Sequence, residues 1–326
     1  MALTTTLSAA LDAVRATEYG LDLNATHTSS GDHALSAHET AILPDSDDTT
    51  FDDTWIEEPP DESLLGEECL TDEWCLYWLP SGLIYHSYMA GVHEPHLALV
   101  TFHEGEGRTL WDATLGGRVG LLQYGNGDPA RPAGYQLDFY GAAIARLDIE
   151  NQQDLEATDY VFGFPLTWGD ERLQFKLGYA HLSSHLGDEL AVRVPATLAD
   201  RVNYVRDSVV FGTSYYPYAA WRIYGEAGFA FHTSGGSEPL ETQYGTELSK
   251  PGPSGPSGTP FLAINARLRE EHDFGGDLAA QVGWMRRGIL GQTMRLGVHY
   301  YNGKSSQFQF FNASEEHVGL GLWYDF

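Results

Sequence analysis

Apolar and polar residues alternate with a period of two along most of the chain from Trp78 onward, and the last segment shows the pattern most clearly. In EEHVGLGLWYDF (315–326), apolar side chains take every second position, namely Val318, Leu320, Leu322, Tyr324 and Phe326. Successive side chains of a β-strand point to opposite faces, so this period predicts a strand with one apolar face. A helix would show a period of about 3.6 residues.

Preceding segments repeat the alternation and predict a series of antiparallel strands. Counted back from the last one, the twelve strands span 315–326, 292–303, 276–287, 260–271, 239–249, 221–233, 205–217, 172–188, 156–168, 134–148, 109–124 and 95–104. An even number of strands returns both ends of a barrel to the same side of a membrane.

The polar face of these strands decides between two all-β architectures. A soluble sandwich packs its apolar face inside and exposes long polar side chains. Here the polar face is rich in Gly, Arg, Glu and Gln, and aromatic residues mark the strand ends, which is typical of a barrel with lipid outside and a wet interior. We therefore predict a twelve-stranded antiparallel transmembrane β-barrel over 95–326, integral to the bacterial outer membrane. The longest nearly apolar stretch, 139–145, is too short for a spanning helix.

If the last strand runs from the cell exterior toward the periplasm, strand direction assigns each connection to one side of the membrane. Turns at 169–170, 217–218 and 287–291 then face the periplasm, and loops at 149–155, 189–204 and 304–314 face outward. The segment PGPSGPSG (251–258) becomes a periplasmic link, which is long for that side. Residues 76–94 precede the first strand, and we expect them to lead into the barrel from the periplasm or to plug it.

Charge is distributed unevenly along the 326 residues, which carry 46 acidic and 18 basic side chains. Residues 1–75 hold 18 of the acids and a single base, Arg15. This composition buries too little apolar surface to offset chain entropy, so we predict an acidic, largely irregular arm that is disordered or loosely docked. The arm is either a solvated tail or a segment that binds divalent cations or an envelope partner. A net charge of −28 argues against nucleic acid as a partner, because phosphate binding requires a basic surface.

Two cysteines, Cys69 and Cys75, stand six residues apart in CLTDEWC. One close pair fits a small-loop disulfide in an oxidising compartment, with free thiols as the alternative. No further ligands are spaced for a metal site. The start, MALTTTLSAALDAV, lacks the basic region of a secretory signal, so we expect an export signal outside this numbering.

Several strings resemble one uncharacterised bacterial family, domain of unknown function 1207. They are WLPSGLIYHSYMAGVHEPH (78–96), FGFPLTW (162–168), YAHLSSHLGDE (179–189), YVRDSVVFG (204–212) and the terminal EEHVGLGLWYDF. The resemblance covers about 76–326 and implies an outer-membrane location without an established activity. The terminal strand, with Tyr324 and a final Phe326, also resembles the signal read by the barrel-assembly machinery. We expect that machinery and outer-membrane lipids as partners.

One strand carries candidate chemistry. His181 and Ser183 share the outward face of 172–188, near its outer end, and a neighbouring imidazole can take the proton of a serine hydroxyl. Asp207 and Glu189 are candidates for the carboxylate that orients such an imidazole. The His-x-Ser step resembles outer-membrane phospholipase A and the lipid A deacylase, so a membrane-lipid acyl hydrolase is one hypothesis. Headgroup or ion binding and a purely structural role are the alternatives, and the acids of 187–189 could hold Ca²⁺.

The polar faces also supply charges of both signs to the interior. The main candidates are Asp112, Arg118, Asp138, Arg146, Arg222, Glu226, Arg267 and Arg295. Unpaired charges are costly in a low dielectric, so we expect Arg–carboxylate pairs across neighbouring strands. The leading prediction is an outer-membrane protein with a structural or narrow small-solute transport role, whose lumen is largely filled by these pairs. A small-solute channel is the contrary outcome.

Overall fold

The computed structural model of the protein describes residues 74–104 and 107–326. The chain divides into two compact units after Gly66, and all described residues belong to the second. The acidic arm predicted over 1–75 lies outside the described residues except for its last two, Trp74 and Cys75. Cys69 also lies outside them, so the Cys69–Cys75 disulfide stays a prediction.

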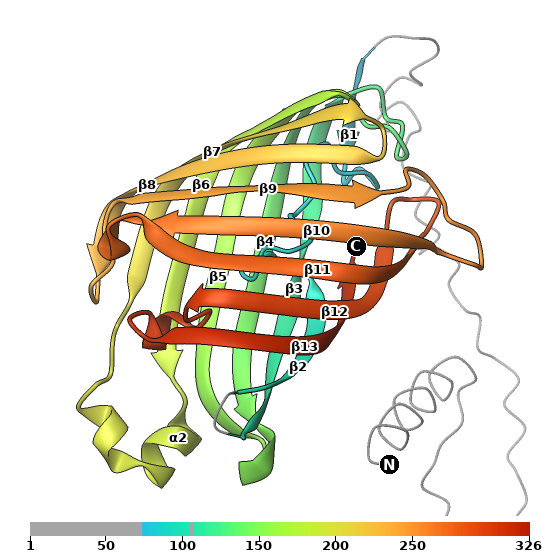
Figure 1. Ribbon diagram of the computed structural model, residues 1–326. Helices are drawn as coiled ribbons and strands as arrows, with labels where there is room; N and C mark the ends of the chain where they lie inside the picture. The colour runs from blue at the N-terminus through green and yellow to red at the C-terminus, as the bar shows by residue number, and fades with distance from the viewer. Residues whose placement is uncertain (1–73, 105–106) are drawn as a thin grey trace, which may run out of the picture. The chain divides into compact units, whose positions relative to one another are not determined.

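Twelve antiparallel strands close into a barrel (Figure 1). The strands are β2 (Leu97–His103), β3 (Thr109–Gly125), β4 (Gly134–Asp148), β5 (Asp154–Gly169), β6 (Leu173–Leu186), β7 (Val205–Tyr218), β8 (Trp221–Ser234), β9 (Leu240–Ser249), β10 (Thr259–Arg269), β11 (Gly275–Arg287), β12 (Thr293–Lys304) and β13 (Ser314–Asp325). Strand β13 pairs with β2, and β2 with β3, which closes the ring. A short strand, β1 (Cys75–Trp78), pairs with the far end of β3. All twelve predicted strands are present with ends within two residues, so the fold class is confirmed.

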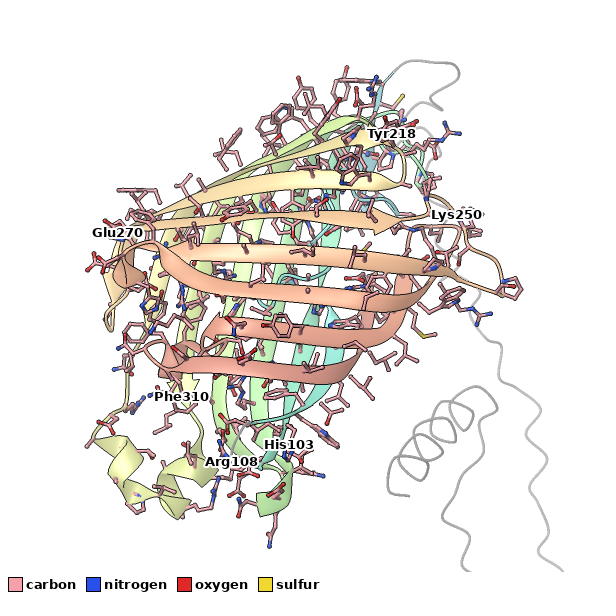
Figure 2. All side chains as sticks on the ribbon, viewed as in Figure 1. His103, Arg108, Tyr218, Lys250, Glu270 and Phe310 are labelled. Atoms are coloured by element: carbon pink, nitrogen blue, oxygen red, sulfur yellow. The ribbon has the colours of Figure 1, made fainter. Side chains whose placement is uncertain are left out.

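The apolar face of the strands is the exterior of the barrel. In β13, the exposed fraction is 60% for Val318 and 47% for Leu320, whereas Trp323 on the other face is 2% exposed. Side chains project outward from the strands along the whole barrel wall (Figure 2). The interior instead holds buried polar and charged side chains from nearly every strand. Within the described residues, no helix has the length and apolar character needed to cross a membrane.

Residues 79–96, which we call the inner segment, pass through the interior. The hydrogen bonds of this segment reach walls on several sides. Arg222 of β8 donates to the carbonyl oxygen of His86 at 2.8 Å, and Arg295 of β12 donates to that of Met89 at 3.0 Å. The Gln136 amide of β4 donates to the carbonyl oxygen of Gly82 at 3.2 Å. Contacts with strands on opposite sides place the inner segment within the ring.

A second segment enters the barrel from the end that carries α2 (Asp188–Arg193). This outer loop, residues 305–311, contains the 3₁₀ helix η6 (Phe308–Phe310) between β12 and β13. Phe308 is 1% exposed, and its ring stacks on Tyr204 with centroids 4.5 Å apart. Arg146 donates to Ser306 Oγ at 2.8 Å, which ties the loop to β4. The loop therefore occupies the mouth of the barrel.

The turn between β7 and β8 lies two residues beyond its predicted position. Tyr218 and Trp221 still pair across the two strands, and their rings stack with an interplanar angle of 10°. The turn itself is Ala219 and Ala220 rather than 217–218. Pro217 is tolerated within β7 because it falls where the pairing with β8 shifts, between Tyr215 and Tyr218, so no ladder hydrogen bond needs its missing N–H.

Asp170 caps the turn between β5 and β6. Its Oδ1 accepts hydrogen bonds from the backbone N–H groups of Arg172 at 2.7 Å and Leu173 at 3.0 Å. These two N–H groups hold the pKa of the Asp170 carboxyl below its usual value. We expect Asp170→Ala to lower the free energy of unfolding by about 1 kcal/mol at pH 7.

The loss of stability in Asp170→Ala should depend on pH. A carboxyl with a depressed pKa in the folded state stabilises above its unfolded pKa, about 4, and loses that contribution as the pH falls through the folded value. The difference between wild type and variant should therefore shrink below pH 4. Urea unfolding at neutral and acidic pH measures it. Glu171→Ala is the control, because the Glu171–Arg131 pair is exposed and contributes little. An equal loss in both variants would contradict the assignment.

Candidate functional site

Three side chains on the outer face of the barrel converge on the carboxylate of Asp207, near the start of β7. His181 of β6 pairs directly with Asp207 across the two strands, and His232 of β8 pairs with it from the other side. Tyr179 precedes His181 by two residues and shares its face. We call these four residues the Asp207 group.

The three contacts divide between the two carboxylate oxygens. His181 Nδ1 lies 2.8 Å from Oδ1, and the Tyr179 hydroxyl donates to the same oxygen at 2.5 Å. His232 Nδ1 lies 2.8 Å from Oδ2. An ionised carboxylate only accepts hydrogen bonds, so each imidazole carries a proton on Nδ1 and, when neutral, a free electron pair on Nε2. His181 thus has the tautomer that a general base needs.

The Asp207 group is partly shielded by the barrel wall. The side chains of His181 and Asp207 are 22% and 19% exposed, whereas that of His232 is 60% exposed. The Phe162 ring lies 4.8 Å from the His181 ring, between centroids, and forms one side of the group. Partial burial beside aromatic rings strengthens the His181–Asp207 interaction relative to a solvated pair.

Ser183 stands two residues beyond His181 on the same outward face. It pairs with Val205 of β7 and with Tyr160 of β5. Among the described residues, no hydrogen bond joins Ser183 to His181. Residues two apart in a strand are about 7 Å apart, so the imidazole of His181 must span most of the gap to the short side chain of Ser183. Catalytic hydrogen bonds are often long in unliganded enzymes.

The two candidates for the orienting carboxylate lie in different places. Asp207 contacts His181 directly. Glu189 lies on α2, exposed to solvent, and takes no part in the Asp207 group. In the described part of the chain, no three His, Cys, Asp or Glu side chains are grouped so that they could hold a metal ion.

His232 was missed by the sequence reasoning. Alternation in β8 places Phe229 and Phe231 outside, which predicts an inward His232. A bulge opposite Asp207 and Ser208 breaks the register there, so His232 faces outward with Phe231. Bulges insert one extra residue in a strand and invert the pattern beyond it.

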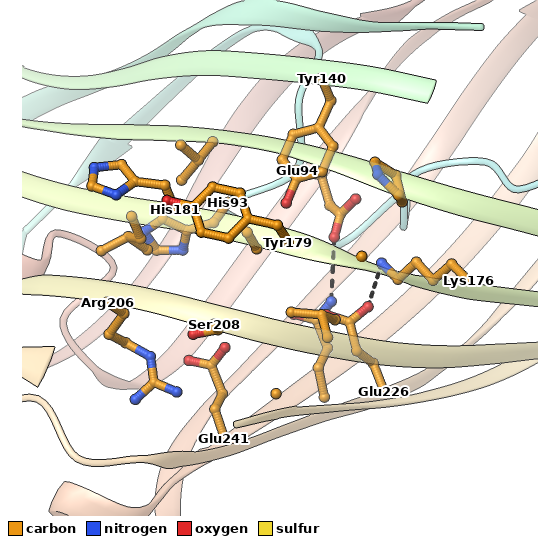
Figure 3. Close-up of a pocket in the computed structure, with 18 of the residues that line it drawn as sticks. His93, Glu94, Tyr140, Lys176, Tyr179, His181, Arg206, Ser208, Glu226 and Glu241 are labelled. Carbon is orange, nitrogen blue, oxygen red and sulfur yellow. Dashed lines mark hydrogen bonds and ion pairs between the residues drawn. The ribbon is translucent and has the colours of Figure 1, made fainter. Parts of the chain in front are cut away.

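Charge pairs line the interior of the barrel. All eight lumen candidates take part, in the pairs Arg118–Asp138 (2.6 Å), Arg146–Asp112 (2.8 Å), Arg222–Glu247 (3.3 Å), Arg267–Glu241 (3.9 Å), Arg295–Asp325 (3.1 Å) and Lys176–Glu226. Figure 3 shows Lys176 and Glu226 beside a cavity of about 90 Å³ that also faces Arg206 and Glu241. Removing one member of such a pair leaves an uncompensated buried charge.

The inner segment and the outer loop meet at Asp159 of β5. Asp159 Oδ2 accepts a hydrogen bond from the backbone N–H of Phe308 at 3.1 Å and lies 3.0 Å from His93 Nε2. Arg267 Nη1 lies 3.0 Å from His93 Nδ1. A guanidinium only donates, so Nδ1 of His93 accepts from Arg267 and the proton of the neutral imidazole lies on Nε2, which donates to Asp159. His93 thereby joins both segments to the wall.

Two further groups of predicted residues lie at the barrel end opposite α2. Tyr324 lies in β13, and its ring meets that of Phe326 edge-on, with centroids 5.1 Å apart. Phe326 is 52% exposed. Cys75 begins β1 and pairs with Gly125 of β3.

A family model for proteins of unknown function, DUF1207, matches residues 107–326. The chain belongs to this family. No curated protein matches this DUF1207 chain.

Three similar solved structures are all outer-membrane phospholipases, each 11% identical to this DUF1207 chain. Outer membrane phospholipase A from Escherichia coli covers 71% of this chain and 94% of its own, with a TM-score of 0.46. An active-site mutant of the E. coli protein at pH 6.1 covers 76% and 98%, with a TM-score of 0.45. The Salmonella typhi phospholipase dimer with bound calcium covers 71% and 92%, with a TM-score of 0.43. Likeness at this level bears on neither the site nor the activity of the DUF1207 chain.

Proposed function

We propose that this DUF1207 protein is an integral barrel of the bacterial outer membrane that hydrolyses acyl esters of membrane lipid at its outer rim. The observation that carries the proposal is the 2.8 Å contact between His181 Nδ1 and Asp207 Oδ1 on the outward face, with Ser183 two residues away. An apolar exterior around a polar interior supports the membrane location. A carboxylate behind an imidazole, on a surface that lipid would cover, is the arrangement that an acyl hydrolase requires.

The reaction uses the chain's own residues. His181 Nε2 takes the hydroxyl proton of Ser183 while Oγ forms a bond to the ester carbonyl carbon, and the carbonyl oxygen becomes an oxyanion. Collapse breaks the bond from that carbon to the lipid alkoxy oxygen, which receives the proton from His181. Water, deprotonated by the same Nε2, then releases the fatty acid and restores Ser183. Asp207 stays ionised throughout and stabilises the imidazolium.

The surroundings of the Asp207 group fit a lipid acyl chain. Phe162, Val209 and Phe231 are 37%, 47% and 62% exposed on the outward face of the neighbouring strands. A chain lying along the wall would cover these side chains and bring its ester to rim depth. Burial of such apolar area contributes about 25 cal/mol per Å².

Fatty-acid release by the purified full chain tests the proposal. Phospholipid and lipid A are offered separately in mixed micelles, with Ca²⁺ and with a chelator, because Asp188 and Glu189 at the rim suit a hard cation. We expect turnover of at least one of the two lipids. Release of no fatty acid from either, under both conditions, would end the hydrolase proposal.

A second candidate function, a structural or narrowly conducting role, is favoured by the two segments inside the barrel. The inner segment and the outer loop lie in series and meet at Asp159. We infer that this arrangement admits at most a narrow water path. In planar bilayers, the wild-type chain is expected to give no large, stable conductance steps. Such steps would contradict the inference and favour a small-solute channel.

A further inference from the structure

A cavity of about 610 Å³ opens at the barrel end opposite α2. Its floor is the inner segment, through Leu83, His86 and Met89. Its walls are formed by the ends of the strands and by the turns that join them. This volume lies within the range of small-molecule sites in proteins, about 300–1,000 Å³. The Asp207 group lies at the other end of β7, so the cavity is independent of the proposed hydrolase.

The unusually long link between β9 and β10 forms one wall of this cavity. Pro251, Gly252 and Pro253 face it. The link is fixed to β11, because Ser254 N donates to the carbonyl oxygen of Arg287 at 3.1 Å and Ser254 Oγ accepts from the N–H of Arg287 at 2.8 Å. A two-residue turn would join β9 to β10 equally well. The extra residues therefore build the cavity wall.

Arg287 is the arginine of this cavity that lacks an acidic partner. Its Nη2 donates to Ser249 Oγ at 3.3 Å, and its Nε is buried without a hydrogen-bond partner. Across residues 74–104 and 107–326, no carboxylate oxygen lies within 4.0 Å of its nitrogen atoms. The other arginines of the cavity form the ion pairs Arg118–Asp138, Arg131–Glu171 and Arg222–Glu247. A partly buried guanidinium with a buried, unused donor is costly unless an anion meets it.

We propose that this cavity binds a small organic monocarboxylate through the guanidinium of Arg287. The fork of N–H donors on an arginine matches the two oxygens of a carboxylate. Tyr216 and the prolines of the link offer apolar walls to the organic body of the ligand. Glu247 and Asp325 also line the cavity, so a doubly charged anion such as a phosphate monoester meets more repulsion than a monocarboxylate.

Calorimetric titration of the purified full chain with benzoate, and with its neutral isostere benzamide, tests the proposal. We expect saturable benzoate binding and at least about tenfold weaker benzamide binding, because the isostere lacks the charge. Arg287→Gln should weaken benzoate binding at least about tenfold. The matched control is Arg286→Gln, which removes the same charge from an exposed neighbour bonded to the carbonyl oxygen of Pro256. It should change the affinity less than about twofold.

Three outcomes would overturn the site. These are wild-type chain without saturable benzoate binding, benzamide bound as tightly as benzoate, and Arg287→Gln binding benzoate like the wild type. Arg287→Lys keeps the charge but loses the fork, and should bind benzoate with an affinity between those of the wild type and Arg287→Gln. If the glutamine variant does not fold, the lysine variant and the benzoate–benzamide comparison decide.

Discussion

Ser183→Ala is expected to lower fatty-acid release from the preferred lipid by at least about a thousandfold. The alanine side chain has no oxygen to form the acyl intermediate, so only hydrolysis by unassisted water would remain. The barrel should be unaffected, because the Ser183 side chain makes no hydrogen bond within the described residues and faces outward. Initial rates at saturating lipid, for wild type and variant in the same micelles, give the ratio.

Ser184→Ala is the matched control for this prediction. Ser184 is the next residue of β6 but points into the barrel, where it is 1% exposed. It loses the same hydroxyl, so any general disturbance of β6 by alanine would appear in both variants. We expect the control to retain most of the wild-type rate. A Ser183→Ala variant as active as wild type would remove Ser183 from the mechanism, and equal losses in both variants would assign the effect to strand stability.

The sequence alone was sufficient for the strands and for part of the site. Because the side-chain period of a strand is two, the apolar positions of β13 fixed both the strand and its outward face. Adjacent antiparallel strands also bring residues of the same face together, which is why Asp207 could be named as a partner of His181. Pairing of neighbours in the chain follows from local pattern.

Contacts between segments distant in the chain could not be predicted in this way. The contacts of the inner segment with Arg222 and Arg295 span 136 and 206 residues, and no local pattern indicates them. Asp159 alternates like any other inward residue of β5, and nothing near it indicates that Phe308 and His93 converge on it. His232 faces outward only because a bulge shifts the register of β8. These features depend on closure of the ring, which brings distant side chains into one interior.

A variant lacking both obstructions inside the barrel is expected to conduct ions in stable open steps, whereas each single variant stays closed. In the first variant, a Gly/Ser sequence of equal length replaces 82–92, which removes Tyr85, Tyr88 and their contacts with the wall. In the second, an Asn-Gly turn replaces 305–313 between the paired ends Lys304 and Ser314. Two obstructions in series each block the path, so only their joint removal opens it.

Single-channel recording in planar bilayers distinguishes open from closed barrels, and circular dichroism checks that each variant keeps its β-structure. Tyr88→Phe is the control, because it removes only the hydroxyl, which donates to Glu226 Oε2 at 2.9 Å, and leaves the ring stacked on Tyr224. It should stay closed. If replacing 82–92 alone opened the barrel, the outer loop would be no barrier to ions. If the double variant remained closed, the paired charges on the wall, rather than the two segments, would fill the lumen.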